Sequence, residues 1–174
     1  EVVNTALINY ISAIGFLVVS LMIPVLTSVA DSYGRKKFFL KTFVYLGASS
    51  CGALALFDVG NPDQIGWTLF FYFTALIGFW SSIVFYNSYL PDIAFEEQQD
   101  RASARGYSMG YIGSVLLLLF NLSMVMMPDA YGIVGNEREA AMLAMKYSFV
   151  SVGVWWALFS MYSFYYLPVG TSEH

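Results

Sequence analysis

The chain has 174 residues, of which 58% are hydrophobic and 11% are charged, and its formal net charge is −4. Soluble domains carry about 25% charged residues, and a soluble fold of this size leaves a large share of its chain at the surface, where so much apolar area has no place. The composition therefore excludes an ordinary soluble domain, and the acidic balance argues against nucleic acid as a partner because phosphate binding needs a basic surface.

Five apolar segments reach the length of about 20 residues that a helix needs to cross a bilayer core of about 30 Å. In chain order, the predicted spanning helices cover residues 6–30, 38–57, 65–90, 106–127 and 137–167. Lipid offers the backbone no hydrogen-bond partners, so helices are the expected solution. Residues 115–120 show no alternation of polar and apolar side chains, which argues against the strands of a membrane barrel. The predicted fold class is an all-α, polytopic transmembrane bundle.

The last helix carries a start signal outside its apolar part. Asn136 can cap a helix, and Glu137 and Glu139 suit the positive end of the helix dipole. We therefore expect this helix to begin there and to continue into the membrane without interruption.

The basic residues predict the orientation of the bundle. Six Lys and Arg residues fall at one end of the predicted helices, namely Arg35, Lys36, Lys37, Lys41, Arg101 and Arg105. The remaining two, Arg138 and Lys146, fall at the other end. By the positive-inside rule the first end faces the cytoplasm. The N-terminus of the chain is then outside, its C-terminus is cytoplasmic, and the expected location is the cell (inner) membrane.

Few residues are of the types that enzymes use. The single His, His174, and the single Cys, Cys51, form neither a catalytic triad nor a cluster of metal ligands, and no phosphate-binding loop is present. No ionisable side chain lies in the middle of a predicted span, where transporters driven by protons usually need one. The chain is predicted not to be an enzyme and to have no cofactor and no metal.

The strongest local motif connects the first two predicted helices, where residues 30–37 read Ala-Asp-Ser-Tyr-Gly-Arg-Lys-Lys. The turn is short, so we expect Gly34 to supply a backbone conformation that other residues resist. Asp31 lies at the membrane end of a helix, where an unpaired carboxylate is costly, and it needs a cation or a helix N-terminus as a partner. The alternative is a plain basic loop that only sets the topology.

This motif resembles the signature between the second and third helices of major facilitator superfamily (MFS) transporters, Gly-x-x-x-Asp-Arg-x-Gly-Arg-Arg/Lys. The matching positions are Asp31, Gly34, Arg35 and Lys36. Thr27 stands where the family has Gly, and Ser32 where it has a cation, which weakens the expected contact with the other half of a transporter. Residues 85–94, 103–113 and 154–159 resemble the "unknown major facilitator" branch, which is related to fungal vacuolar efflux proteins linked to autophagy.

The resemblance implies that residues 1–174 correspond to helices two to six of a twelve-helix transporter. They would form a partial N-terminal six-helix half, with the first helix and the C-terminal half absent from this sequence. The implied function is secondary active transport of a small solute by rocker-switch alternating access. The implied partners are the lipid bilayer, the C-terminal half of the same transporter and a small-molecule substrate. The alternative is a non-transporting structural or accessory subunit that keeps the fold.

The resemblance also implies a gating role for the charged loop. In the family, the Asp of the loop meets a helix end of the other half, and its Arg pairs with an acid at the end of the fourth helix. Here this predicts an ion pair between Arg35 and Asp92, with Arg101 or Arg105 as the alternative partner of Asp92. The residues expected in this cytoplasmic gating loop are Asp31, Gly34, Arg35, Lys36, Asp92 and Arg105.

Polar side chains within the predicted spans are either part of a substrate pathway or helix–helix bonds, because an unbonded polar group in lipid is costly. For the serines, we favour a role in helix packing over a role in the substrate pathway. The candidates for the substrate pathway are Asn9, Tyr10, Asn87, Tyr107 and Asn121. Small residues at 47–53, and the pair Gly106 and Gly110, are expected to let helices approach closely.

Overall fold

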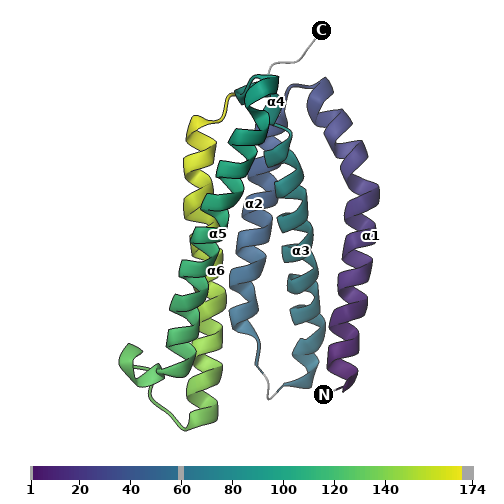
Figure 1. Cartoon of the computed structure of the whole chain (residues 1–174). Helices are drawn as coiled ribbons and strands as arrows, with labels where there is room; N and C mark the ends of the chain where they lie inside the picture. Colours follow the sequence, from purple (N-terminus) through teal and green to yellow (C-terminus); the bar gives the residue numbers. More distant parts are fainter. Residues whose placement is uncertain (1, 59–60, 170–174) are drawn as a thin grey trace.

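A computed structural model describes residues 2–58 and 61–169, which form a bundle of long helices (Figure 1). The long helices are α1 (Val2–Ser32), α2 (Lys36–Ala53), α3 (Ile65–Asn87), α5 (Glu96–Met126) and α6 (Glu137–Tyr166). The connections contain the short helix α4 (Leu90–Ile93) and the 3-10 turns Leu54–Leu56, Pro62–Gln64 and Pro128–Tyr131. Over these described ranges no strand occurs, and five helices are long and apolar enough to cross a membrane. The predicted all-α transmembrane bundle is confirmed; His174 lies outside the described residues.

The helix bounds differ from the predicted spans in α2, α3 and α5. Helix α2 ends at Ala53, before the predicted limit of 57. Residues 96–105 form the first turns of α5, which therefore begins well before the predicted span of 106–127. Glu96 and Glu97 lie in that first turn, where the positive end of the helix dipole favours carboxylates. Helix α3 ends at Asn87, before the predicted limit of 90, and Pro91 lies at the start of α4, a position that suits its missing N–H.

The predicted start of the last helix is confirmed as a capping box. The side-chain oxygen of Asn136 accepts a hydrogen bond from the backbone N–H of Glu139 at 2.9 Å. The carboxylate of Glu139 in turn accepts one from the N–H of Asn136 at 3.3 Å. This reciprocal arrangement satisfies two donors that a helix end would leave open.

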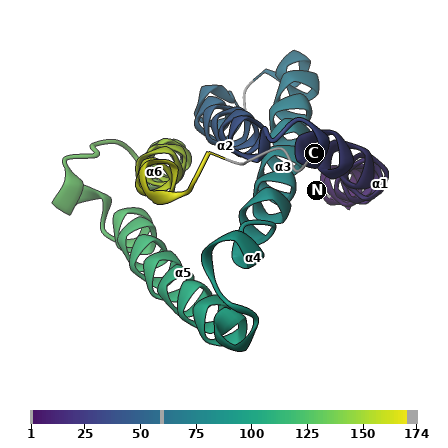
Figure 2. The same ribbon diagram turned by 90° about the horizontal axis from the view of Figure 1, so that it is seen from above.

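Helix α2 occupies the middle of the arrangement. It packs against α3 on one side and α6 on the other, while α1 packs on α3 and α5 packs on α6 (Figure 2). The order of neighbours across the bundle is therefore α1, α3, α2, α6 and α5.

Glycines bring α2 close to both of its neighbours. A Cβ on Gly78 of α3 would lie 2.5 Å from the Cα atom of Gly47, and one on Gly153 of α6 would lie 2.7 Å from the carbonyl oxygen of Ala48. The indole ring of Trp156 packs against Gly47. Without an attractive hydrophobic force between helices in lipid, such close backbone approach supplies the packing energy. The predicted small-residue face at 47–53 is confirmed.

The same prediction for Gly106 and Gly110 on α5 is wrong for the described part of the chain. A Cβ on Gly110 would meet no atom within 4 Å, and one on Gly106 would meet the Tyr86 hydroxyl oxygen at 3.5 Å. The reason is that α5 packs mainly on α6, and these glycines do not lie in that contact.

Side-chain hydrogen bonds connect neighbouring helices, which is one of the two roles expected for polar groups within the spans. The bonds are Ser12 to Tyr72 at 2.8 Å, Thr74 to Ser50 at 2.9 Å and Ser151 to Asn121 at 2.7 Å. They join α1 to α3, α3 to α2, and α6 to α5 in turn. Bonds of this kind between membrane helices contribute about 0.6 kcal/mol on average.

Because α2 and α3 are in close contact, one added methyl group between them should lower the stability of the fold markedly. Gly78→Ala forces the new Cβ against backbone atoms that cannot turn away, so we expect a loss of about 1–3 kcal/mol in the free energy of unfolding. Gly66→Ala, in the same helix, is the control, because its Cβ would meet nothing within 4 Å. Chemical unfolding in detergent, followed by tryptophan fluorescence, measures both variants. Equal stabilities of the two would contradict the close packing.

Candidate functional site

The turn between α1 and α2 has the geometry of a Schellman motif. Gly34 has a φ of 61°, the left-handed conformation that side chains resist. Its N–H donates to the carbonyl of Asp31 at 3.1 Å, and the N–H of Arg35 donates to the carbonyl of Ala30 at 2.9 Å. These are the two bonds that close this type of helix end. The conformational role predicted for Gly34 is confirmed.

Lys36, the first residue of α2, joins two carboxylates at this end of the bundle. Its Nζ atom lies 3.2 Å from a carboxylate oxygen of Asp92 in α4 and 3.5 Å from one of Asp31 at the end of α1. The Lys36 side chain is 20% exposed, whereas those of Asp92 and Asp31 are 35% and 59% exposed. A single ammonium thus connects the ends of α1, α2 and α4, and we call these three residues the charged cluster.

The partner of Asp92 in this structure is Lys36, which corrects the prediction of Arg35. Arg35 caps α2 from outside the helix and is exposed. The alternatives Arg101 and Arg105 are exposed on α5, and no carboxylate of the described residues lies within 4.0 Å of any of the three guanidinium groups. The cause is the tight turn at Gly34, after which the first side chain of α2 to reach α4 is that of Lys36.

Lys37 makes a further connection that the sequence analysis did not identify. Its Nζ atom donates a hydrogen bond to the carbonyl oxygen of Leu167 at 2.6 Å. Leu167 caps the C-terminal end of α6, where a cation is favoured by the negative end of the helix dipole. The only sequence signal was the run of three basic residues, which does not show which side chain meets which helix.

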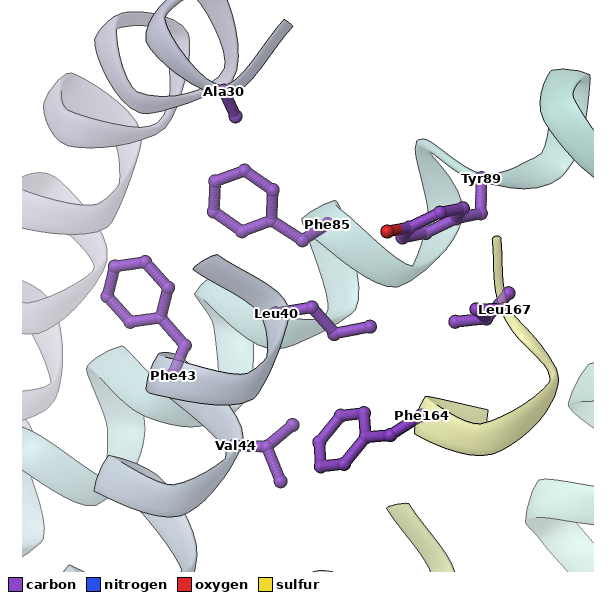
Figure 3. Packing of buried hydrophobic residues seen from close by; sticks show 8 residues of the cluster. All are labelled: Ala30, Leu40, Phe43, Val44, Phe85, Tyr89, Phe164 and Leu167. Carbon is purple, nitrogen blue, oxygen red and sulfur yellow. The ribbon is translucent and has the colours of Figure 1, made fainter. Parts of the chain in front are cut away.

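Beneath the charged cluster lies the main buried core of the bundle. Its buried members are Ala30, Leu40, Phe43, Val44, Phe85, Tyr89, Phe164 and Leu167 (Figure 3). The ring of Phe85 is stacked on those of Phe39 and Phe43, with centroid distances of 5.5 and 5.8 Å. The charged groups therefore lie next to a buried layer of stacked aromatic rings contributed by α2 and α3.

Tyr89 is the unusual member of this core. It is fully buried, and its hydroxyl group has no hydrogen-bond partner among the described residues. Figure 3 shows the ring with its hydroxyl turned into the cluster. Burial, together with the negative charge of Asp92, raises the pKa of this phenol to about 12. The group is therefore neutral, as an apolar neighbourhood requires.

The structure does not bring the five substrate-pathway candidates into one contact group. Asn9 and Tyr10 are exposed on α1, Asn87 is exposed at the end of α3, and Tyr107 is exposed on α5. Asn121 accepts the hydrogen bond of Ser151 and so serves helix packing. Within the described residues, no group of His, Cys, Asp and Glu has an arrangement that could hold a metal ion.

Comparison with known proteins places the whole chain within one family. The family model described as "Vacuole effluxer Atg22 like" matches residues 1–174. An "Uncharacterized MFS-type transporter YxiO" of Bacillus subtilis (strain 168) is 32% identical over 160 residues, which cover 91% of this chain and 35% of the relative. An "Uncharacterized protein" of Aquifex aeolicus (strain VF5) is 32% identical over 110 residues, which cover 63% of this chain and 27% of the relative. The chain thus spans about a third of the length of these relatives. No solved structure matches it.

The ion pair between Lys36 and Asp92 predicts a measurable coupling between the two residues. In a double-mutant cycle with Lys36→Met and Asp92→Asn, we expect a coupling free energy of about 0.2–1 kcal/mol, because both side chains are partly exposed. The coupling should fall as salt is added. The matched cycle with Arg35→Met and Asp92→Asn should give a value near zero. A larger coupling for Arg35 than for Lys36 would refute the pairing seen here.

Because the buried hydroxyl of Tyr89 has no partner among the described residues, its removal should not destabilise the protein. Tyr89→Phe removes a polar group without a partner, so we expect unchanged or increased stability to unfolding in detergent. Tyr72→Phe is the control, because it removes a bond to Ser12 and should cost about 0.5–1.5 kcal/mol. A loss of stability in Tyr89→Phe as large as in the control would show that the hydroxyl has a partner.

Proposed function

The chain belongs to the vacuole effluxer Atg22-like family, and we propose that it forms part of a secondary active transporter that moves a small solute by rocker-switch alternating access. The name of the Bacillus subtilis relative as an MFS-type transporter supports this assignment, as do the five helices of spanning length among the described residues. The proposed partner in the motion is the C-terminal half of the same transporter, which would rock against this half around a solute site. The family description as an effluxer favours movement of the solute out of a compartment.

The single observation that carries the mechanism is the bridge made by Lys36 between Asp31 and Asp92. Partly exposed ion pairs contribute up to about 1 kcal/mol each. Contacts of that strength bias one of two conformations and still break in each transport cycle, whereas a much stronger contact would lock the protein. The carboxylate of Asp31 stays 59% exposed beside Lys36, and we propose that it also meets the positive N-terminus of a helix from the other half.

The charged cluster is proposed to close the cytoplasmic side. Arg35, Lys36 and Lys37 lie at this end, and the positive-inside rule places such residues in the cytoplasm. In this orientation the N-terminal end of α1 is outside, and the cell (inner) membrane is the proposed location. Asn9, Tyr10, Asn87 and Tyr107 remain the proposed contributors to the solute pathway, since they are exposed on this half.

Loss of the bridge should open the cytoplasmic side more often. In Lys36→Met, both ion pairs vanish, and each 1 kcal/mol lost changes the ratio of the two states about fivefold. In the full-length transporter, where the proposed C-terminal half would cover this end in the closed state, we expect a cysteine introduced as Asn87→Cys to react several-fold faster with a water-soluble maleimide. Arg101→Gln removes one charge at the same end without breaking an ion pair and should leave the rate unchanged. Equal rates in all three proteins would contradict the gating role.

Transport itself is tested with the purified full-length transporter, in which this chain is joined to the proposed C-terminal half. Amino acids, sugars and nucleosides are screened for thermal stabilisation, because a ligand at 100 times its Kd stabilises a protein by about 2.7 kcal/mol. Compounds that stabilise it are then offered to proteoliposomes, where Lys36→Met should change the transport rate. The absence of both stabilisation and transport for every class would favour a non-transporting accessory subunit instead.

A further inference from the structure

A groove runs between α2 and α6, away from the charged cluster. Its volume is about 690 Å³, which is within the range of roughly 300–1,000 Å³ found for small-molecule sites. Apart from Tyr45, much of the wall consists of small or aliphatic residues, including Ser49, Gly52, Gly153, Val154 and Ala157. A Cβ on Gly52 would meet no atom within 4 Å, so part of the groove exists because this residue has no side chain.

The groove faces the surroundings of the bundle and not its interior. Tyr45 is 47% exposed and Val154 is 51% exposed, although both lie in the middle of helices of spanning length. Figure 2 shows α2 and α6 side by side, with α3 beyond α2 and α5 beyond α6. In a membrane, an exposed concave surface at this place is filled by lipid.

A cation without an acidic partner among the described residues, Lys41, directly precedes Thr42, which lines the groove. Lys41 lies one helical turn before Tyr45, is exposed, and has its Nζ atom 5.6 Å from the centroid of the Phe164 ring. The Tyr45 ring is 5.7 Å from the same ring. Among the residues that the structure describes, no carboxylate lies within 4.0 Å of the Lys41 ammonium. The contact with Phe164 orients this charge without neutralising it.

We propose that the groove is a binding site for a glycerophospholipid with an anionic headgroup. One acyl chain lies along the groove between α2 and α6, and the phosphate group lies beside Lys41, within reach of the Tyr45 hydroxyl. An unpaired ammonium at the edge of the hydrocarbon layer is costly, and its long side chain can extend toward the headgroups. A phosphate there supplies the missing negative charge, and each basic residue near a membrane surface strengthens the binding of anionic lipid.

The shape of the groove distinguishes this site from ordinary lipid contact. On a convex helix surface an acyl chain has protein on one side only, whereas in the groove it contacts both α2 and α6. Because dispersion attraction grows with the number of atoms in contact, the chain is held more firmly there. The headgroup preference arises from Lys41, and the affinity for the chain arises from the space at Gly52, so the two parts can be tested separately.

The test is native mass spectrometry of the purified full chain, titrated with phosphatidylglycerol or with phosphatidylcholine in detergent. The wild type should bind phosphatidylglycerol more tightly than phosphatidylcholine. Lys41→Gln should weaken phosphatidylglycerol binding about fivefold and abolish this preference. Arg101→Gln, which removes another exposed cation at the same end, should have no effect. Equal binding of phosphatidylglycerol to wild type and Lys41→Gln would overturn the proposal.

A second variant tests the groove itself. Gly52→Leu fills the space that the acyl chain would occupy, so it should weaken the binding of both lipids by a similar factor. Gly66→Leu is its control, because that position is also open but lies outside the groove. Unfolding in detergent confirms that both variants fold. Undiminished lipid binding by folded Gly52→Leu would place the lipid elsewhere and refute the site.

Discussion

The close approach of α2 to α3 and α6 is the contact on which the remaining structure depends. Gly47, Gly78 and Gly153 allow the backbones of α2, α3 and α6 to approach closely. In lipid the hydrophobic effect does not drive helices together, so this close packing is needed for their association. With α2 held between its neighbours, its first turn is fixed over the ends of α3 and α6. The aromatic layer around Phe85 can then form, and the charged cluster stands on that layer. The site is therefore a consequence of helix packing in the middle of the bundle.

Most of the fold could be predicted from the sequence, because its signals are local. The apolar length of each segment, the capping box at Asn136 and the left-handed glycine at position 34 each depend on a few neighbouring residues. Gly110 is an example of what local sequence signals cannot predict. A small residue permits close packing but does not show whether another helix lies against it. The start of α5 was missed because a polar segment of residues 96–105 can be helical outside the membrane without any apolar pattern.

The sequence predicted that Asp31, Asp92 and the basic loop lie at one end of the bundle, but it did not predict that Lys36 is the partner of Asp92. Asp31 and Asp92 were correctly expected to lie at the same end as the basic loop, because the helices alternate in direction. Which cation meets Asp92 depends on where α2 begins, and a shift of one residue turns each side chain by about 100° around the helix axis. Helix ends are uncertain by one or two residues in any assignment, so Arg35 and Lys36 could not be separated before the turn geometry was known.

Once α2 is known to begin at Lys36, the roles of its three lysines follow from helical spacing. Lys37 and Lys41 are four residues apart and share one face of α2, and both meet α6, at Leu167 and Phe164. Lys36 lies one residue away from that face and reaches Asp31 and Asp92 instead. One helix thus directs cations both toward the proposed gate and toward its contact with α6. Since Lys41 directly precedes Thr42 in the wall of the groove between α2 and α6, a lipid bound at the proposed site would contact the same helix that carries Lys36, which would connect the composition of the membrane to the element on which the proposed gate is built.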